Sequence, residues 1–326
     1  MIFINNEQKQ GKGKAKIMEK SFHGGVWPVM LTPFTEDGHV DYKGLEYLVD
    51  WYIDHGCKGL FSVCQSSEMY FLSIEERIQI AKAVVSMAAG RVPVIASGNI
   101  AEREEERAEE TQRMAETGVD AVILITNQFA SQTENNEIWL ERCISFLDKL
   151  QPDILLGFYE CPYPYKRLIS LENLKACADT GRFYFLKDTC CDIELIKERI
   201  QVIKGSRLKL YNANSTTLLE SLRAGAVGFS GVMANFHPEL YAYLCAHPDR
   251  GDIDYLQDFL SLAALIERQY YPANAKYHLQ RMEGLPISTY CRKQDAKGLN
   301  KTFRKEIEMM DELAGKFLKY YEEGGK

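Results

Sequence analysis

Short apolar runs alternate with amphipathic stretches along most of the chain, beginning near Val26. The runs are only a few residues long and are bounded by glycine and polar residues, which is typical of buried strands. Between the runs, apolar positions repeat with a period near 3.6, as they do in helices that cover a sheet. We mark each predicted strand by one residue: Val26, Leu60, Val92, Ala121, Leu155, Tyr184, Leu208 and Val227.

This alternation predicts the fold class. Eight strand-and-helix units in succession are typical of a (β/α)8 TIM barrel, an α/β fold. A doubly wound parallel sheet is the alternative, but no G-x-G-x-x-G motif opens the first unit. Local signals support two of the helices, because Asp41 is placed to cap one and Ser73 to Glu76 form a capping-box pattern for the next.

The two ends of the chain differ from this pattern. Residues 1–22 are polar and lysine-rich and lack the apolar region of a secretory signal. We interpret them as a flexible tail, or as an upstream start ahead of Met18. After about Gly251 the pattern is helical to the end. We therefore predict a barrel over residues 23–250 and a C-terminal helical extension over residues 251–326.

Composition narrows the class of protein. The 326 residues are 46% apolar and 26% charged, as in soluble globular proteins. A net charge of −7 argues against non-specific binding to nucleic acid or anionic membranes, and no apolar run could span a bilayer. Nine cysteines without zinc-site spacing indicate reduced thiols in a cytoplasm. His237 and His278 are isolated in the sequence, so we expect no metal site.

The segment FYFLKDTCCD, from Phe183 to Asp192, combines a buried strand with reactive side chains. Lys187 follows the apolar run, where we expect little water around its amine. Desolvation disfavours the ammonium form, and a free amine can attack a carbonyl carbon to form a Schiff base. The alternative is a strand-end lysine whose charged end reaches solvent.

Other strand ends carry polar residues as well, and in TIM barrels active sites lie at the C-terminal ends of the strands. A lysine there supplies a nucleophile and a tyrosine a proton carrier, while hydroxyl and N–H groups can hold a carboxylate. We therefore expect one mouth to gather the following strand ends: Cys64–Glu68, Thr126–Phe129, Tyr159, Lys187, Tyr211–Asn214 and Ser230–Val232.

These motifs resemble the dihydrodipicolinate synthase / N-acetylneuraminate lyase family of class I aldolases. FYECP, from Phe158 to Pro162, is similar to the tyrosine motif Y-N-x-P of the family, and FLKDT matches its Schiff-base lysine motif. Tyr159 and Lys187 are 28 residues apart (187 − 159), as in the family pattern. CQSSE and GFSGVMAN resemble two of its loops. The resemblance covers roughly Gly25 to the C-terminal helices.

The resemblance implies a role for each matching residue. Lys187 is expected to condense with the keto group of pyruvate or another 2-oxo acid, and Tyr159 to relay protons. Ser66 and Ser67 would bind the substrate carboxylate, and Thr189 would orient groups near the lysine. The other expected substrate contacts are Gln65, Phe129, Asn214, Gly231 and Val232.

The resemblance also implies a homotetramer, a dimer of dimers in which the loops after the fourth strand meet and Phe129 lies at or near a subunit contact. It implies an enzyme without a cofactor, acting on a 2-oxo acid and an aldehyde as a carbon–carbon or carbon–oxygen lyase. Asp188 is interpreted as a structural hydrogen-bond acceptor, and Cys190 and Cys191 as packing residues.

Several positions depart from the family pattern. Gln65 stands where the synthases carry a hydroxyl, Phe129 replaces a tyrosine that a neighbouring subunit supplies, and Pro164 replaces an arginine. The acidic pair of the sialic acid lyases falls at Ser215 and Thr216.

We therefore expect neither of these activities but a different aldehyde, in a pocket shaped by Gln65, Phe129, Tyr163 and Asn214. Two alternatives stay open: 4-hydroxy-tetrahydrodipicolinate synthase proper, or a catalytically silent paralogue that binds a 2-oxo acid or a partner protein.

Overall fold

The strands of the computed structural model, which describes residues 22–324, all run parallel in one sheet. Our interpretation of residues 1–21 lies outside the described residues. All eight predicted strand markers fall inside a strand or one or two residues before it. The strands are β1 (Gly25–Val26), β2 (Leu60–Val63), β3 (Val94–Ser97), β4 (Ala121–Ile125), β5 (Leu156–Tyr159), β6 (Phe183–Asp188), β7 (Lys209–Asn212) and β8 (Gly228–Phe229).

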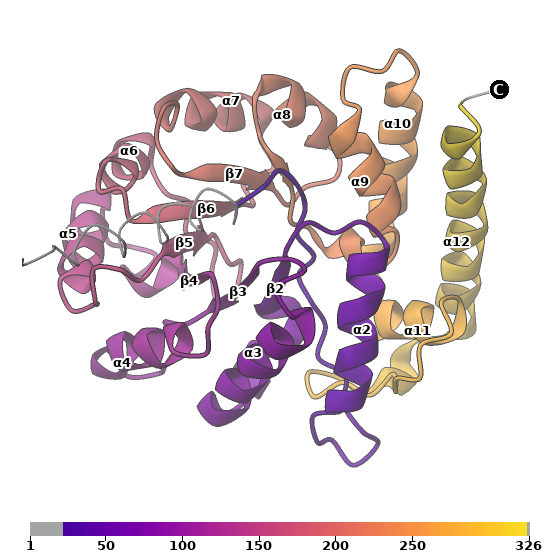
Figure 1. The fold of residues 1–326 in the computed structure, drawn as a ribbon, viewed down its shortest axis with the longest axis horizontal. Helices are drawn as coiled ribbons and strands as arrows, with labels where there is room; N and C mark the ends of the chain where they lie inside the picture. The colour runs from indigo at the N-terminus through magenta and orange to yellow at the C-terminus, as the bar shows by residue number, and fades with distance from the viewer. Residues whose placement is uncertain (1–21, 325–326) are drawn as a thin grey trace, which may run out of the picture.

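The sheet curls into a barrel. The strand order is β1-β8-β7-β6-β5-β4-β3-β2, so consecutive strands are neighbours and β8 returns to β1. A parallel bridge between Val29 and Phe61 joins the segment after β1 to β2, where the N–H of Met30 donates to the carbonyl of Phe61 at 3.0 Å. The predicted TIM barrel is confirmed, and Figure 1 shows its helices around the strands.

A helix follows each strand from β2 to β7, and α2 precedes β2. Asp41 accepts a hydrogen bond from the N–H of Gly44, and Ser73 and Glu76 form the predicted capping box. Each contact satisfies a backbone donor that a helix start leaves free. The helices are α2 (Tyr42–Asp54), α3 (Ile74–Ala88), α4 (Glu104–Ala115), α5 (Asn136–Leu147), α6 (Leu171–Asp179), α7 (Ile193–Val202) and α8 (Leu218–Ala224).

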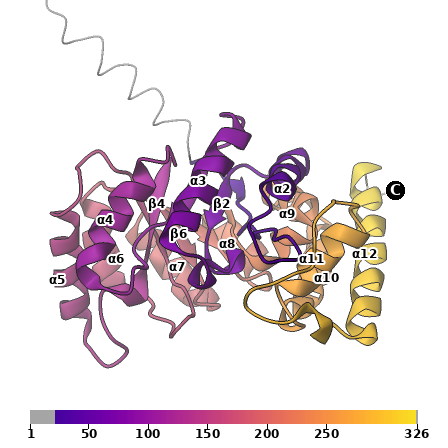
Figure 2. The same cartoon turned by 90° about the horizontal axis from the view of Figure 1, so that it is seen from below.

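Helices without intervening strands continue from β8 to the end of the described chain. Figure 2 shows the last of them gathered on one side of the barrel. Among residues 22–324, no helix is both long and apolar enough to cross a membrane. These helices are α9 (Pro238–Ala246), α10 (Ile253–Ala263), α11 (Ala273–Arg281) and α12 (Lys301–Glu322).

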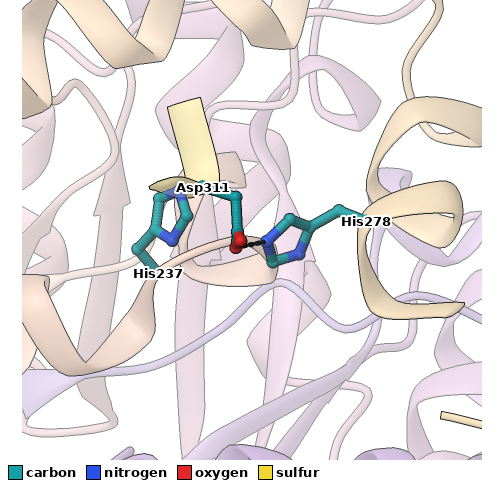
Figure 3. Close-up of side chains that lie close together, drawn as sticks. All are labelled: His237, His278 and Asp311. Atoms are coloured by element: carbon teal, nitrogen blue, oxygen red, sulfur yellow. Dashed lines mark hydrogen bonds and ion pairs between the residues drawn. The ribbon is translucent and has the colours of Figure 1, made fainter. Parts of the chain in front are cut away.

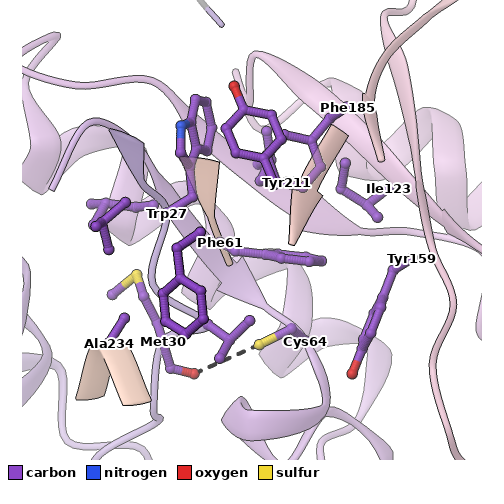
Figure 4. Packing of buried hydrophobic residues seen from close by; sticks show 14 of the residues in the cluster. Trp27, Met30, Phe61, Cys64, Ile123, Tyr159, Phe185, Tyr211 and Ala234 are labelled. Carbon is purple, nitrogen blue, oxygen red and sulfur yellow. Dashed lines mark hydrogen bonds between the residues drawn. The ribbon is translucent and has the colours of Figure 1, made fainter. Parts of the chain in front are cut away.

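The barrel interior is filled by large aromatic side chains. The rings of Phe185 and Tyr211 stack with centroids 4.1 Å apart, and Trp27 lies 5.2 Å from Phe185. Phe61 contacts both Phe185 and Tyr159 edge-on, as Figure 4 shows. An interior packed in this way is a core and not a pore. Polar chemistry is therefore restricted to the end of the barrel where Tyr159 lies.

The sequence-based expectation that His237 and His278 are isolated is wrong in three dimensions. His237 precedes α9 and His278 lies in α11, yet their ring centroids are 5.2 Å apart. The two segments are 41 residues apart (278 − 237). No local spacing signals their contact, because it depends on how the C-terminal helices pack.

Candidate active site

The structure places Lys187 beside Tyr159 on adjacent strands. The two residues are direct partners in the register of β5 and β6, so both side chains point to the same side of the sheet. The Nζ atom of Lys187 lies 4.3 Å from the centroid of the Tyr159 ring. Each residue is only 4% exposed. The predicted nucleophile and proton carrier are therefore brought together in a buried setting.

Burial shapes the reactivity of the lysine. Desolvation lowers the pKa of Lys187 to about 8, while Cys64, Cys161 and Glu267 oppose this shift. At pH 7 roughly a tenth of the amine is then uncharged, far more than for a lysine in water. The reading of Lys187 as a solvent-reaching strand-end lysine does not fit this environment.

Tyr159 is oriented by an amide. Its hydroxyl donates to the Oε1 atom of Gln65 at 3.2 Å, and the thiol of Cys161 approaches the same oxygen at 3.6 Å. Tyr70 extends this group, because its hydroxyl lies 3.6 Å from the Cys161 sulfur. Burial raises the pKa of Tyr159 well above its usual value, so the phenol keeps its proton at neutral pH.

A cavity of about 260 Å³ opens in front of the lysine. It brings together most of the residues that the sequence predicted for substrate binding. Predicted residues that line it are Gln65, Ser66, Tyr159, Lys187, Thr189, Asn214, Gly231 and Val232. The remaining lining residues are Pro162, Lys166, Cys191, Ala213, Glu267, Tyr271, Pro272 and Lys293.

Three predicted pocket residues do not line this cavity. The Ser67 hydroxyl is engaged by the backbone of Cys64, accepting from its N–H at 2.8 Å and donating to its carbonyl at 2.7 Å. Phe129 is 4% exposed and packs edge-on against Trp139 inside its own chain. Tyr163 is 54% exposed. Ser67 thus shapes a turn, and Phe129 belongs to the core beneath α5.

The segment that follows α10 supplies residues that the sequence did not indicate. Glu267, Tyr271 and Lys293 all line the cavity. Burial raises the pKa of Glu267, although Lys187 and Arg268 oppose the shift. The Tyr271 hydroxyl accepts from the Nδ2 atom of Asn235 at 3.1 Å. These residues belong to no motif near the lysine, and no feature of the sequence could have identified them.

A fully buried ionic cluster lies directly behind Tyr159 and Lys187. Arg199 in α7 pairs with Glu160 at 2.7 Å and with Asp188. Glu160 follows Tyr159, and Asp188 follows Lys187. Asp188 also accepts from the N–H of Cys190 at 2.9 Å. The interpretation of Asp188 as a structural acceptor is confirmed, and the cluster ties the ends of β5 and β6 to α7.

Two basic residues near Pro164 differ in their orientation. Lys166 lines the cavity, and its Nζ atom donates to the carbonyl of Thr189 at 2.7 Å. Arg167 instead donates to the carbonyls of Ser131, Glu134 and Asn135. Only Lys166 of these two is therefore placed to meet an anionic substrate group.

Comparison with known proteins agrees with this geometry. The model of the Dihydrodipicolinate synthetase family matches residues 22–307. A 4-hydroxy-tetrahydrodipicolinate synthase from Psychrobacter arcticus is 28% identical over 79% of this chain and 85% of its own length.

Solved structures share the fold. The chloride-inhibited dihydrodipicolinate synthase from Acinetobacter baumannii, complexed with pyruvate, superposes with a TM-score of 0.79 at 24% identity, covering 90% of this chain and 99% of its own. A monomeric dihydrodipicolinate synthase variant gives a TM-score of 0.80 at 18% identity over 91% of this chain and 98% of its own.

Proposed function

Because the chain belongs to the dihydrodipicolinate synthetase family, we propose that it is a class I aldolase that forms or cleaves a carbon–carbon bond of a pyruvate-type 2-oxo acid through an imine at Lys187. One observation carries this proposal: the buried amine of Lys187, with its pKa near 8, faces a cavity beside Tyr159. An uncharged amine is the form that attacks a carbonyl.

The chemistry follows from the two side chains. The Nζ atom of Lys187 attacks the keto carbon of the substrate, and the adduct loses water as Tyr159 supplies a proton to the leaving oxygen. The resulting iminium withdraws electrons, so a proton can leave the adjacent carbon to give an enamine. The enamine carbon then attacks the aldehyde, or the reverse sequence cleaves the bond.

The substrate carboxylate needs donors at the mouth. Ser66 lines the cavity and follows Gln65 in a 3-10 turn, so its hydroxyl and its own N–H are the donors that we assign to the carboxylate. Thr189 lines the same cavity, and its hydroxyl donates to the carbonyl of Glu160 at 2.7 Å. This hydrogen bond ties the end of β6 to the end of β5, beside the reacting lysine.

The aldehyde partner is proposed to differ from that of the synthases. The hydroxyl of Tyr159 meets the amide of Gln65, and an amide is a poor proton carrier at neutral pH. Phe129 adds no hydroxyl and is buried away from the cavity. These positions therefore cannot supply the relay of three hydroxyl groups. This favours an aldehyde whose reaction does not depend on that relay.

A second candidate is 4-hydroxy-tetrahydrodipicolinate synthase itself. Lys166 and Lys293 both line the cavity, so a carboxylate on the second substrate could be held without the arginine that Pro164 replaces. A lysine binds such a group as a point charge and lacks the two-pronged geometry of arginine. For this candidate, the carboxylate of the second substrate would be bound with less geometric specificity than an arginine provides.

Steady-state kinetics separates the candidates. We expect turnover with some member of a panel of aldols that release pyruvate, measured by a coupled assay of pyruvate. With pyruvate plus aspartate semialdehyde, or with N-acetylneuraminate, we expect a kcat/KM below the ordinary enzyme range of about 10⁴ M⁻¹s⁻¹. A value above that on either substrate would overturn the proposed difference. Imine trapping without turnover on any aldol would instead identify a silent binding protein.

Assembly and location are part of the same proposal. We propose that the protein is a homotetramer, as the resemblance implies, and that it is cytoplasmic, as its cysteines suggest. All nine cysteines are unpaired, which suits a reducing compartment. We also retain the division into a barrel over residues 23–250 and a helical extension over residues 251–326 as a proposal.

A further inference from the structure

Two histidines and an aspartate meet outside the active site, between the C-terminal helices. His237 stands at the start of α9, His278 lies in α11 and Asp311 in α12. One nitrogen or oxygen ligand atom from each lies within 4.8 Å of those of the other two. Figure 3 shows the two imidazole rings on opposite sides of the Asp311 carboxylate. None of the three residues lines the catalytic cavity.

The hydrogen-bonding capacity of this cluster is only partly used. His278 is bonded to Asp311 through its Nε2 atom at 2.9 Å. The Nε2 atom of His237, the Nδ1 atom of His278 and the Oε2 atom of nearby Glu239 are buried without a partner. Both histidines are at most 2% exposed. Leaving a buried polar atom unpaired costs free energy, so the free nitrogen of His237 indicates room for a ligand. The free nitrogen of His278 is not the one that is bonded to Asp311.

The charges around the cluster point to a cation. In the part of the chain that the structure describes, no lysine or arginine forms an ion pair with Asp311 or with Glu239. His278 is the only residue there that pairs with Asp311. The side chain of Asp311 is 31% exposed. An ion could therefore enter from solvent on the carboxylate side and lie against the buried imidazoles.

We propose that His237, His278 and Asp311 bind a divalent transition-metal ion, with Zn²⁺ as the best match, and that this ion ties α9, α11 and α12 together. Imidazole nitrogen and carboxylate oxygen are both ligands of Zn²⁺ in proteins, and two histidines with one carboxylate form the ligand set of some zinc sites that keep a fourth position open. Ligand atoms around one tetrahedral Zn²⁺ lie about 3.3 Å apart, given bonds of about 2.0–2.1 Å. The present spacing of at most 4.8 Å would therefore shrink by at most about 1.5 Å (4.8 − 3.3) on binding.

The ion takes the place of the hydrogen bond between His278 and Asp311 and uses the free nitrogen of His237. Three protein ligands leave a fourth position for water. Because the ligands come from three different helices, binding adds its free energy to the stability of the C-terminal helices.

The test uses the full-length protein, stripped with a chelator and then titrated with Co²⁺, whose visible absorption reports its ligands. We expect one equivalent of Co²⁺ to bind with the d–d bands of nitrogen and oxygen ligation, without the charge-transfer band of thiolate ligation. Zn²⁺ should displace it and raise the temperature of thermal unfolding. Metal analysis after dialysis gives the stoichiometry.

The variants assign the site. His237→Ala and Asp311→Asn should each lose the cobalt bands and the zinc-dependent rise in unfolding temperature. Asp311→Asn preserves the shape of the side chain, so it keeps the test valid if His237→Ala fails to fold. His247→Ala is the matched control, because His247 is exposed at the end of the same helix α9, and it should bind as the unchanged protein does. Absence of bands in the unchanged protein, or bands that survive both substitutions, overturns the proposal.

Discussion

At the scale of the residue, the reactivity of Lys187 rests on the removal of water. Desolvation is the largest cause of its lowered pKa, and the groups that oppose it are two thiols and Glu267. Neither thiol is ionised at neutral pH, because burial raises the pKa of both Cys64 and Cys161. The amine is therefore tuned by its apolar surroundings rather than by a neighbouring cation.

The first prediction concerns the imine at Lys187. Pyruvate with borohydride should leave one reduced pyruvate on Lys187, seen by peptide mass. Lys187→Arg should lose both adduct and turnover, because guanidinium stays protonated. An adduct on another lysine would show that the nucleophile has been misassigned.

The pH dependence of that step follows from the sign of the shift. A lowered pKa of about 8 means that the uncharged amine is the minority form below pH 8 and the majority form above it. The rate of imine formation should rise about tenfold per pH unit below pH 8 and level off above it. Stopped-flow measurement between pH 6 and about 9.5 checks this, and a tenfold rise per pH unit that continues to the top of this range would mean an ordinary lysine pKa.

The third prediction concerns Tyr159. Tyr159→Phe keeps the ring over the lysine and removes the proton carrier, so kcat should fall by about 10²–10⁴-fold. Tyr163→Phe is the matched control, because Tyr163 is exposed and does not line the cavity. Near-normal turnover of Tyr159→Phe would leave the tyrosine with a packing role only.

Residue types and spacing made the meeting of Lys187 and Tyr159 predictable, whereas other parts of the site depend on tertiary packing. Tyr159 is the last residue of β5 and Lys187 is the last but one of β6, so their convergence follows from the barrel. Glu267 and Tyr271 reach the mouth only because the chain after α10 folds back over it. Phe129 was expected in the pocket, but the aromatic groups of Trp139 and Phe146 offer it a better-packed position in the core.

At the scale of the element, a single buried arginine joins the ends of the two strands that carry Tyr159 and Lys187. The side chain of Arg199 is fully buried. It pairs with Glu160, which follows Tyr159, and with Asp188, which follows Lys187. Its Nη2 atom also donates to the carbonyl of Ile169 at 2.9 Å, which extends the contact to the chain before α6. Charges buried away from water are costly unless opposite charges pair with them, so the arginine and the two carboxylates depend on one another.

The fourth prediction tests that cluster. Arg199→Leu leaves Glu160 and Asp188 buried without their cation, which should lower the free energy of unfolding by about 3–5 kcal/mol. Arg223→Leu is the control, because Arg223 pairs with Asp254 at the surface, where a pair contributes only about 0–1 kcal/mol. Urea denaturation measures both, and equal effects would contradict the assigned role of Arg199.

Another buried ion pair joins the C-terminal extension to the loop after β2, which carries Ser66. Lys276 in α11 donates to Glu68 at 2.9 Å, and both side chains are fully buried. Glu68 has a positive φ of 61° and follows the turn that carries Ser66. Its second oxygen accepts from the N–H of Lys293 at 2.7 Å. The extension is therefore part of the active-site architecture, a role that helical periodicity alone could not reveal.

At the scale of the whole molecule, the architecture was the most predictable property. Eight apolar runs alternating with helices admit few parallel arrangements, and right-handed connections favour closure. The first and last residues of each strand were harder to predict from the sequence, because they depend on pairing with neighbouring strands in the sheet. β1 spans only Gly25–Val26, and the barrel closes there through the single bridge from Val29 to Phe61.

The last prediction concerns assembly. Light scattering at micromolar concentration should give a mass near four times 37.3 kDa for the proposed tetramer, and a monomer would overturn it. Phe129 is buried within its own chain, so it cannot extend an aromatic ring into the cavity of a neighbour. Dilution that dissociates the tetramer should therefore leave the turnover per chain unchanged, with mass photometry recording the assembly at each concentration. A loss of turnover that tracks dissociation would mean that a partner subunit completes or rigidifies the site.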